Sequence, residues 1–150
     1  MKKLIIFCSL FLTGCALWET REVFLGPSLS TIRKVEKKYE KSIDKDIVYC
    51  YDTTIKIIKD DMGAEVYKKD RRRGYIIGMA FDTIFPGCLE TTGVGIIFKE
   101  TEPGKTKIEV ASGNYNLAEF VAKQLFDRLE GKISLGEKIS LVTQKDLEQP

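Results

Sequence analysis

The stretch GVGIIFKETEPGKTKIEVAS, residues 93–112, contains the pattern that decides the fold. Apolar side chains occupy every second position in both of its halves, at Val94, Ile96 and Phe98 and again at Ile108 and Val110. Pro103 and Gly104 lie between the halves, where neither residue readily continues a strand. A period of two predicts two adjacent antiparallel strands that have one apolar face and one solvated face.

A second hairpin is predicted just before this stretch. Residues 64–70 are predicted to form a short strand, and residues 75–81, which are rich in Tyr, Ile, Met and Phe, a second one. The segment RRRG at residues 71–74 separates them as a turn. Pro86 and Gly87 interrupt any further strand, so residues 82–90 are predicted to form a longer connection. The segment GVG at residues 93–95 lacks the spacing of a phosphate-binding loop, and we interpret its glycines as positions of close packing against a helix.

An amphipathic helix is predicted before the first hairpin. Between residues 43 and 62, apolar side chains recur every three or four positions, at Ile47, Tyr51, Ile55, Ile58 and Met62. Ser42 and Asp44 are the candidate caps, and Gly63 is the expected stop. Residues 31–41 fit either a helix or an edge strand, and the strand is favoured because the candidate caps follow at once.

A second amphipathic helix is predicted after residue 112. Asn114 or Asn116 is its expected cap, and Gly131 follows its expected end. Its buried stripe consists of Leu117, Val121 and Leu125. The order strand, helix, four strands, helix predicts an α+β domain, in which an antiparallel sheet of four to five strands packs two helices on one face. We assign this domain to residues 31–131 and interpret residues 132–150 as a loosely attached tail.

The first fourteen residues have the parts of a secretory signal. Lys2 and Lys3 precede an apolar run at residues 4–12, and the small residues Thr13 and Gly14 follow it. The run of about nine residues is far shorter than the roughly 20 that span a bilayer as a helix. Residues 1–14 are therefore predicted to be a signal peptide, cleaved before Cys15. The alternative is an ordinary secretory signal in which this cysteine occurs by chance.

The segment LTGC at residues 12–15 closely resembles the lipobox of bacterial lipoproteins. The resemblance implies that the Cys15 thiol carries a diacylglyceryl group, and that Cys15 becomes an acylated N-terminus after cleavage. Several acyl chains on one residue give lasting membrane attachment. In the lipoprotein sorting rule of enteric bacteria, a residue other than Asp after the lipidated cysteine leads to transfer to the outer membrane. Residue 16 is Ala, so the resemblance implies the periplasmic side of the outer membrane. Residues 15–30 are then expected to be a lipidated tether.

The domain also resembles small bacterial envelope lipoproteins of unknown function. The shared pattern consists of KVEKKY at residues 34–39, YDTTI at 51–55, Asp70, Gly74 and TKIEV at 106–110. The resemblance covers residues 30–131, and its motifs mark strand, helix, turn and strand. It therefore implies a fold and a location but no activity. Residues 84–89 do not match the pattern.

Composition and motifs argue against several functional classes. The 150 residues suffice for one compact domain, and the absence of histidine removes the commonest general base and metal ligand. Asp52, Asp60 and Asp61 are interpreted as helix-surface carboxylates with no partner that would suit them to acid–base catalysis. Once two of the 24 basic residues leave with the signal, 22 basic side chains balance 22 acidic ones, which disfavours nucleic acid as a partner. We predict no enzyme activity, no cofactor and no metal.

Cys50 and Cys88 are the thiols that remain after Cys8 is removed and Cys15 is acylated. In an oxidising compartment a disulfide between them is predicted, which would stabilise the fold by about 3–4 kcal/mol. The alternative is two small buried side chains. A redox pair is the least favoured interpretation, because no CxxC motif is present.

Five basic residues surround the turn of the first hairpin, namely Lys68, Lys69, Arg71, Arg72 and Arg73. They are a candidate contact for anionic lipid head groups or another envelope protein, since the guanidinium fork fits phosphate oxygens. The alternative is a solvated turn that keeps a sheet edge soluble. We predict a membrane-anchored, non-catalytic binding or assembly module. The second hypothesis is a carrier that holds a lipid or small hydrophobic ligand between sheet and helix.

Overall fold

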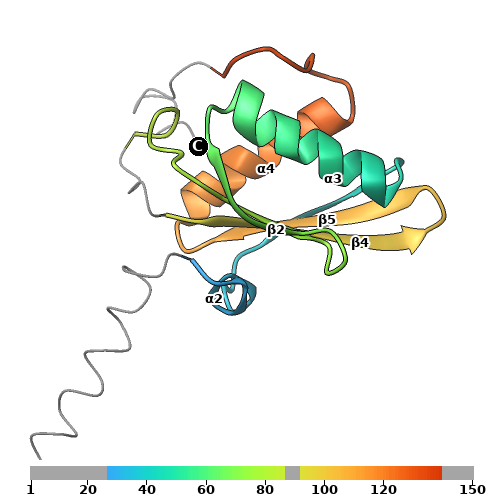
Figure 1. The fold of residues 1–150 in the computed structure, drawn as a ribbon, viewed down its shortest axis with the longest axis horizontal. Coiled ribbons are helices and arrows are strands. Elements are labelled where there is room, and N and C mark those ends of the chain that lie inside the picture. Colours follow the sequence, from blue (N-terminus) through green and yellow to red (C-terminus); the bar gives the residue numbers. More distant parts are fainter. Residues whose placement is uncertain (1–26, 87–91, 140–150) are drawn as a thin grey trace, which may run out of the picture.

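The protein folds around one antiparallel sheet with helices on both faces (Figure 1). The computed structural model describes residues 27–86 and 92–139. Its strands are β1 (Tyr39–Ile43), β2 (Glu65–Asp70), β3 (Tyr75–Met79), β4 (Val94–Glu102) and β5 (Lys105–Ser112). They lie in the order β1-β5-β4-β3-β2, and all four pairings are antiparallel. The predicted α+β class and its five-stranded antiparallel sheet are confirmed.

Strands β4 and β5 form the centre of the sheet and follow the alternation in the sequence. Ile96 pairs with Val110 and Phe98 pairs with Ile108, and all four side chains are buried in the main core. Partners in an antiparallel pair share a face of the sheet, so the apolar positions of both strands line one surface. Gly104 has a φ of +78° in the turn between them. This positive φ suits glycine and closes the hairpin where it was predicted.

Two long helices cover this apolar surface. Helix α3 (Ile47–Lys56) continues as the π-helix η1 (Ile57–Asp61), and α4 (Tyr115–Leu129) lies beside it (Figure 1). The Asn114 side chain caps α4 by accepting a hydrogen bond from the Leu117 amide at 3.1 Å. Leu117, Val121 and Leu125 are fully buried, as the helical period predicts. The two predicted helices on one face are thus present.

The start of the first long helix differs from the prediction. Ile43 is the last residue of β1, and Asp46 caps α3 by accepting a hydrogen bond from the Tyr49 amide at 2.8 Å. The predicted caps, Ser42 and Asp44, do not serve because the chain is still in or just leaving the strand. Gly63 follows the helix with a φ of +63°, as expected of a stop.

Residues 31–41 divide into two elements, so the prediction of one strand there is wrong. A short helix, α2 (Leu29–Arg33), packs on the opposite face of the sheet from α3 and α4, and β1 begins only at Tyr39 (Figure 1). Ile32 of α2 lies so close to the sheet that a Cβ on Gly95 would be 2.4 Å from its Cγ2. Close helix packing at this glycine is therefore confirmed. The tether was predicted to extend through residue 30, but α2 already begins at Leu29, so the folded domain starts before the predicted boundary.

The end of the domain also extends beyond the predicted boundary. Residues 132–139 fold back over the helices, and the Ile139 amide donates to the Asp61 carbonyl at 3.0 Å. Ile139 packs against the main core. These residues belong to the fold and are not a loosely attached tail, whereas residues 140–150 lie outside the described part of the chain.

Candidate functional site

The β2–β3 turn presents three consecutive arginines in a fixed backbone shape. The Asp70 side chain accepts a hydrogen bond from the Arg73 amide at 3.0 Å, and the Gly74 amide donates to the Arg71 carbonyl at 3.2 Å. Gly74 has a φ of +63°, and its carbonyl accepts from the Phe98 amide at 2.8 Å. A Cβ at this glycine would lie 2.6 Å from the Phe98 carbonyl oxygen. The turn is therefore held by both its own bonds and the neighbouring strand.

Arg71 is the member of the turn that contacts the helix layer. Its guanidinium pairs with Asp52 of α3 and lies over the Tyr51 ring, 5.4 Å from the centroid. Asp52 is partly exposed on α3, as predicted for a helix-surface carboxylate, and Arg71 is a partner that the sequence did not identify. Tyr51 is itself buried, and this burial raises the pKa of its phenol. Arg71 thus anchors the turn to α3.

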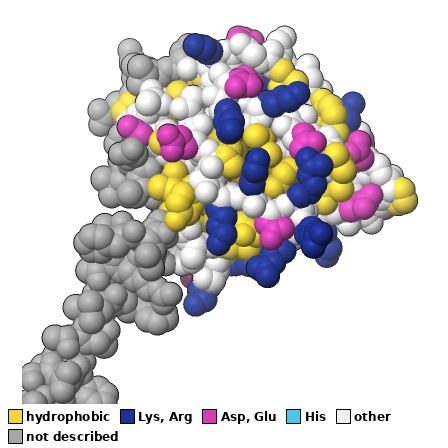
Figure 2. Space-filling model, viewed as in Figure 1, with side chains coloured by type: hydrophobic (Ala, Val, Ile, Leu, Met, Phe, Trp, Pro, Cys, Tyr) yellow, Lys and Arg dark blue, Asp and Glu magenta, His cyan; other side chains and the backbone are white. Residues whose placement is uncertain are grey.

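The remaining basic residues of the hairpin are less constrained. Arg73 lies 3.7 Å from Asp70, while Lys68, Lys69 and Arg72 are exposed and have no ion-pair partner among residues 27–86 and 92–139. Figure 2 shows Lys and Arg side chains spread over the viewed face from top to bottom, several of them on its lower half, where Figure 1 places α2 and the β2–β3 turn. The structure therefore brings the five predicted basic residues together on one edge and leaves three of them available.

The opposite edge of the sheet carries paired charges. Lys38 lies 3.0 Å from Glu109, and Lys107 lies 2.5 Å from Glu40 across the β1–β5 ladder. Lys107 lowers the pKa of Glu40. The charges at this edge are mostly neutralised by contacts within the chain, so they offer little net attraction to a charged partner.

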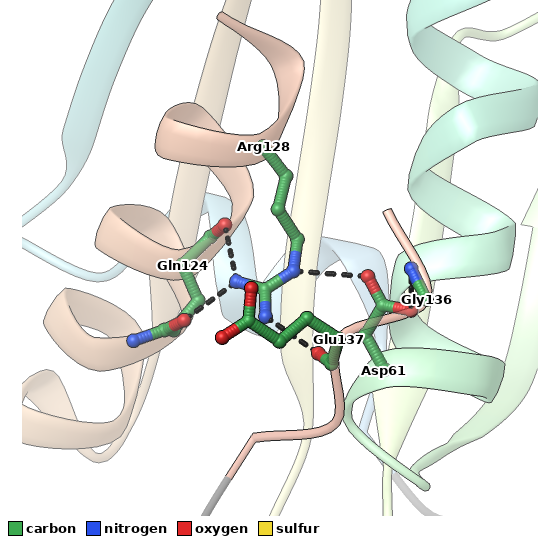
Figure 3. A network of polar contacts seen from close by, with 5 residues as sticks. All are labelled: Asp61, Gln124, Arg128, Gly136 and Glu137. Atoms are coloured by element: carbon green, nitrogen blue, oxygen red, sulfur yellow. Dashed lines mark hydrogen bonds and ion pairs between the residues drawn. The ribbon is translucent and has the colours of Figure 1, made fainter. Parts of the chain in front are cut away.

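A cluster of polar side chains at the foot of α4 was missed by sequence analysis (Figure 3). Asp61 was predicted to lie on a helix surface, but it is buried and its Oδ2 accepts from Nε of Arg128 at 2.9 Å. Its Oδ1 accepts from the Gly136 amide at 2.9 Å, and Arg128 also donates to the carbonyls of Glu137 at 2.9 Å and Gln124 at 3.3 Å. The one available signal was an arginine between the apolar residues of a helical stripe.

This cluster has a structural role, and we call it the Asp61–Arg128 clasp because it binds the segment at Gly136 and Glu137 to the helices. No buried side-chain nitrogen or oxygen of the described ranges lacks a hydrogen-bond partner, so neither charge of the pair is left to act on a ligand. The clasp instead holds residues 136–139 against the helices. Asp60, its neighbour, is exposed as predicted.

Cys50 is a free thiol in this structure and is fully buried in the main core. Burial raises the pKa of the thiol, which keeps it protonated. Its sulfur lies 3.9 Å from the Lys45 carbonyl oxygen, which also accepts a hydrogen bond from the Thr106 hydroxyl of β5. Cys88 lies outside the described residues. The disulfide stays a prediction.

Cys15 and the rest of the lipobox also lie outside the described residues. Within the part that the structure describes, no helix is long and apolar enough to cross a membrane. No group of three or more carboxylate or thiol side chains there lies close enough together to hold a metal ion. No family model matches this chain, and a comparison with curated proteins finds no match. The resemblance to envelope lipoproteins therefore stays a prediction.

Proposed function

We propose that this protein is a non-catalytic envelope lipoprotein that binds an anionic component of the envelope through the β2–β3 hairpin. Acyl chains on Cys15 hold it at the membrane, on the periplasmic side of the outer membrane. The observation that carries the binding role is the unpaired basic charge of the hairpin, where Lys68, Lys69 and Arg72 have no carboxylate partner among the described residues.

The packing of the domain supports surface binding over the carrier hypothesis. A carrier would hold its ligand between the sheet and the helices. In the described residues this space contains fully buried apolar side chains from both layers, including Ile57, Ile58, Ile96, Ile108, Leu117 and Leu125. The hairpin, in contrast, is exposed, and its unpaired Arg72 presents a planar set of donors that suits phosphate or carboxylate oxygens.

Metabolic labelling tests the anchor. Cells that express the full chain are grown with an alkyne fatty acid, and acylation is read from the purified protein by coupling a fluorophore. We expect label on the wild type, none on Cys15→Ala, and full label on Cys8→Ala, which changes a cysteine inside the predicted signal. A wild-type protein without label would contradict the lipoprotein assignment.

In-cell crosslinking tests the binding role. The lipoprotein is crosslinked, purified and compared with the variant Lys68→Ser/Arg72→Ser, which removes two exposed and unpaired charges. We expect a crosslinked product, protein or lipid, that the variant loses. The double change Lys123→Ser/Lys138→Ser removes two other exposed charges and should retain the product. A product that survives the hairpin change would contradict binding at this edge.

A further inference from the structure

Helix α2 lies on the opposite side of the sheet from α3 and α4, and the β2–β3 turn, although its Arg71 reaches back to α3, bends toward the α2 side (Figure 1). The described chain begins on this side, because Pro27 sits against Gly93 at the start of β4. Cys15 precedes Pro27 by twelve residues, which span at most about 40 Å when extended. An acyl anchor on Cys15 therefore keeps the α2 side of the domain within that distance of the bilayer.

Unpaired basic residues spread across this side. Arg33 of α2 and Lys34, which follows the helix, are exposed. Lys68 of β2 pairs with Ile77 of β3, and the Ile77 side chain packs in the small apolar cluster that includes Ile32 of α2. Lys99 of β4 pairs with Lys107 of β5, and both lie on the α2 face of the sheet. Arg72 lies in the turn between β2 and β3. We call these five residues, Arg33, Lys34, Lys68, Arg72 and Lys99, the α2-side basic surface. None of them has an ion-pair partner within the described ranges.

The carboxylates nearby do not cancel this charge. Glu40 and Glu109 are held by Lys107 and Lys38, and Asp70 is held by the turn. Glu36 is exposed just after α2, and Glu65 is exposed on β2, where it pairs with Met79 on the face of Ile77. Together they offset two of the five positive charges. The net charge of the surface is therefore positive.

We propose that the α2-side basic surface binds the anionic head groups of the same bilayer that carries the Cys15 acyl chains. The inference rests on the proposed function and extends its contact from the hairpin to α2. Acylation and a basic patch act together because the anchor removes most of the entropy cost of reaching the membrane. The bound domain lies with α2 toward the head groups and with α3 and α4 toward the periplasm.

A bilayer fits this surface better than a folded protein partner does. Protein interfaces centre on apolar and aromatic anchors that become buried. Among the described residues, four of the five exposed large apolar side chains, Val48, Tyr49, Tyr115 and Leu135, belong to α3, α4 and the segment after α4. The fifth, Tyr67, is a single aromatic side chain at the β2 irregularity beside Lys68, and tyrosine also suits a membrane interface. The α2-side basic surface itself contributes charge spread over a broad area, which is what a layer of phosphate groups recognises.

Vesicle binding tests the inference without the anchor. The mature chain, residues 15–150 with Cys15→Ser, contains all of the described fold and is mixed with phosphatidylcholine vesicles with or without phosphatidylglycerol. We expect binding to the anionic vesicles alone, and weaker binding as salt rises and screens the charges. The change Arg33→Gln/Lys34→Gln should weaken it roughly 25-fold, at about five-fold for each charge removed. The hairpin change Lys68→Gln/Arg72→Gln should have a similar effect.

The control change Lys123→Gln/Lys138→Gln removes equal charge elsewhere and should weaken binding less than about five-fold. Thermal unfolding followed by circular dichroism checks that each variant is folded. Equal losses in all three variants, or no affinity for anionic vesicles, would overturn the inference. A crosslinked protein that only the hairpin change removes would also overturn it while leaving the proposed function intact. Absence of acyl label on Cys15 would defeat the anchor, and with it the claim that the bilayer is the one that carries the acyl chains. The vesicle experiment uses an unacylated chain, so the affinity of the surface for anionic head groups is measured independently of that result.

Discussion

At the β1 edge of the sheet, Lys38, Lys41 and Lys107 each contact a carboxylate, whereas at the β2 edge Lys68 and Lys69 contact none within the described residues. Both edges are rich in lysine, so composition does not distinguish them. The difference lies in where the carboxylates come from. Glu109 of β5 and Glu130 after α4 reach the β1 edge from other elements. At the β2 edge, Asp52 of α3 pairs with Arg71 of the turn, and the lysines of β2 are left without a carboxylate among the described residues.

This difference shows how to read charged edges in a structure. Lysine on an edge strand discourages pairing with another chain, and either edge satisfies that need. When a basic side chain pairs with a carboxylate, the two opposite charges largely cancel each other's electric field. Unpaired charges of one sign keep their field and can attract a partner of opposite charge. The β2 edge therefore carries the functional proposal, and the β1 edge serves as its internal control.

The largest expected effect concerns the Asp61–Arg128 pair, which is buried apart from the surface charges of both edges and holds the segment after α4. Arg128→Met leaves the buried Asp61 carboxylate without its charged partner, and we expect it to lower the free energy of unfolding by about 3–5 kcal/mol. Urea denaturation followed by circular dichroism measures this loss. The double change Asp61→Leu/Arg128→Met should recover much of it, because no unpaired charge remains. A loss below about 1 kcal/mol in the single variant would show that the pair is unimportant.

The turn that displays the arginines should be less tolerant than the turn between β4 and β5. Gly74→Ala requires both a positive φ and the movement of the Phe98 carbonyl, so we expect a loss of about 2–4 kcal/mol. Gly104→Ala also has a positive φ, but a Cβ there meets nothing within 4 Å, so about 1 kcal/mol should be lost. The same denaturation experiment compares the two. Equal losses would mean that the hairpin backbone is not specially constrained.

The smallest expected effect is the acid sensitivity of the β1 edge. Lys107 holds the pKa of Glu40 below the ordinary value of 4.5 in the folded protein. A lowered folded pKa adds stability above the unfolded pKa, and this stability is lost as the pH falls through the folded value. Glu40→Gln should therefore reduce the drop in urea midpoint between neutral pH and roughly pH 3.

Glu65→Gln is the matched control for this measurement, because Glu65 is an exposed carboxylate on the β2 edge that has no ion-pair partner in the described chain. The comparison of the two edges fails if Glu65→Gln changes the acid sensitivity as much as Glu40→Gln does.

Elements with a long regular period were predictable. The β4–β5 hairpin repeats its alternation over two strands, and α4 combines a buried stripe with a local cap at Asn114. These signals depend on residues close together in the chain, so no distant contact is needed to interpret them.

Features held by distant contacts were not predictable. Helix α2 has five residues, too few to be stable alone, and it depends on Ile32 packing against the sheet near Gly95. Asp61 looks like a surface carboxylate until Arg128, 67 residues later, is brought beside it. The segment after Gly131 is polar, and its attachment through Gly136 and Ile139 follows from that same clasp.

The candidate site divides in the same way. The sequence by itself determined that five basic residues would share one hairpin, because a tight turn keeps near neighbours in the chain together. Only the tertiary structure decided which of them are paired and that α2 brings Arg33 and Lys34 to the same side of the sheet. The physical reason is that local propensity acts over a few residues, whereas charge pairing depends on which distant elements the core packing places side by side.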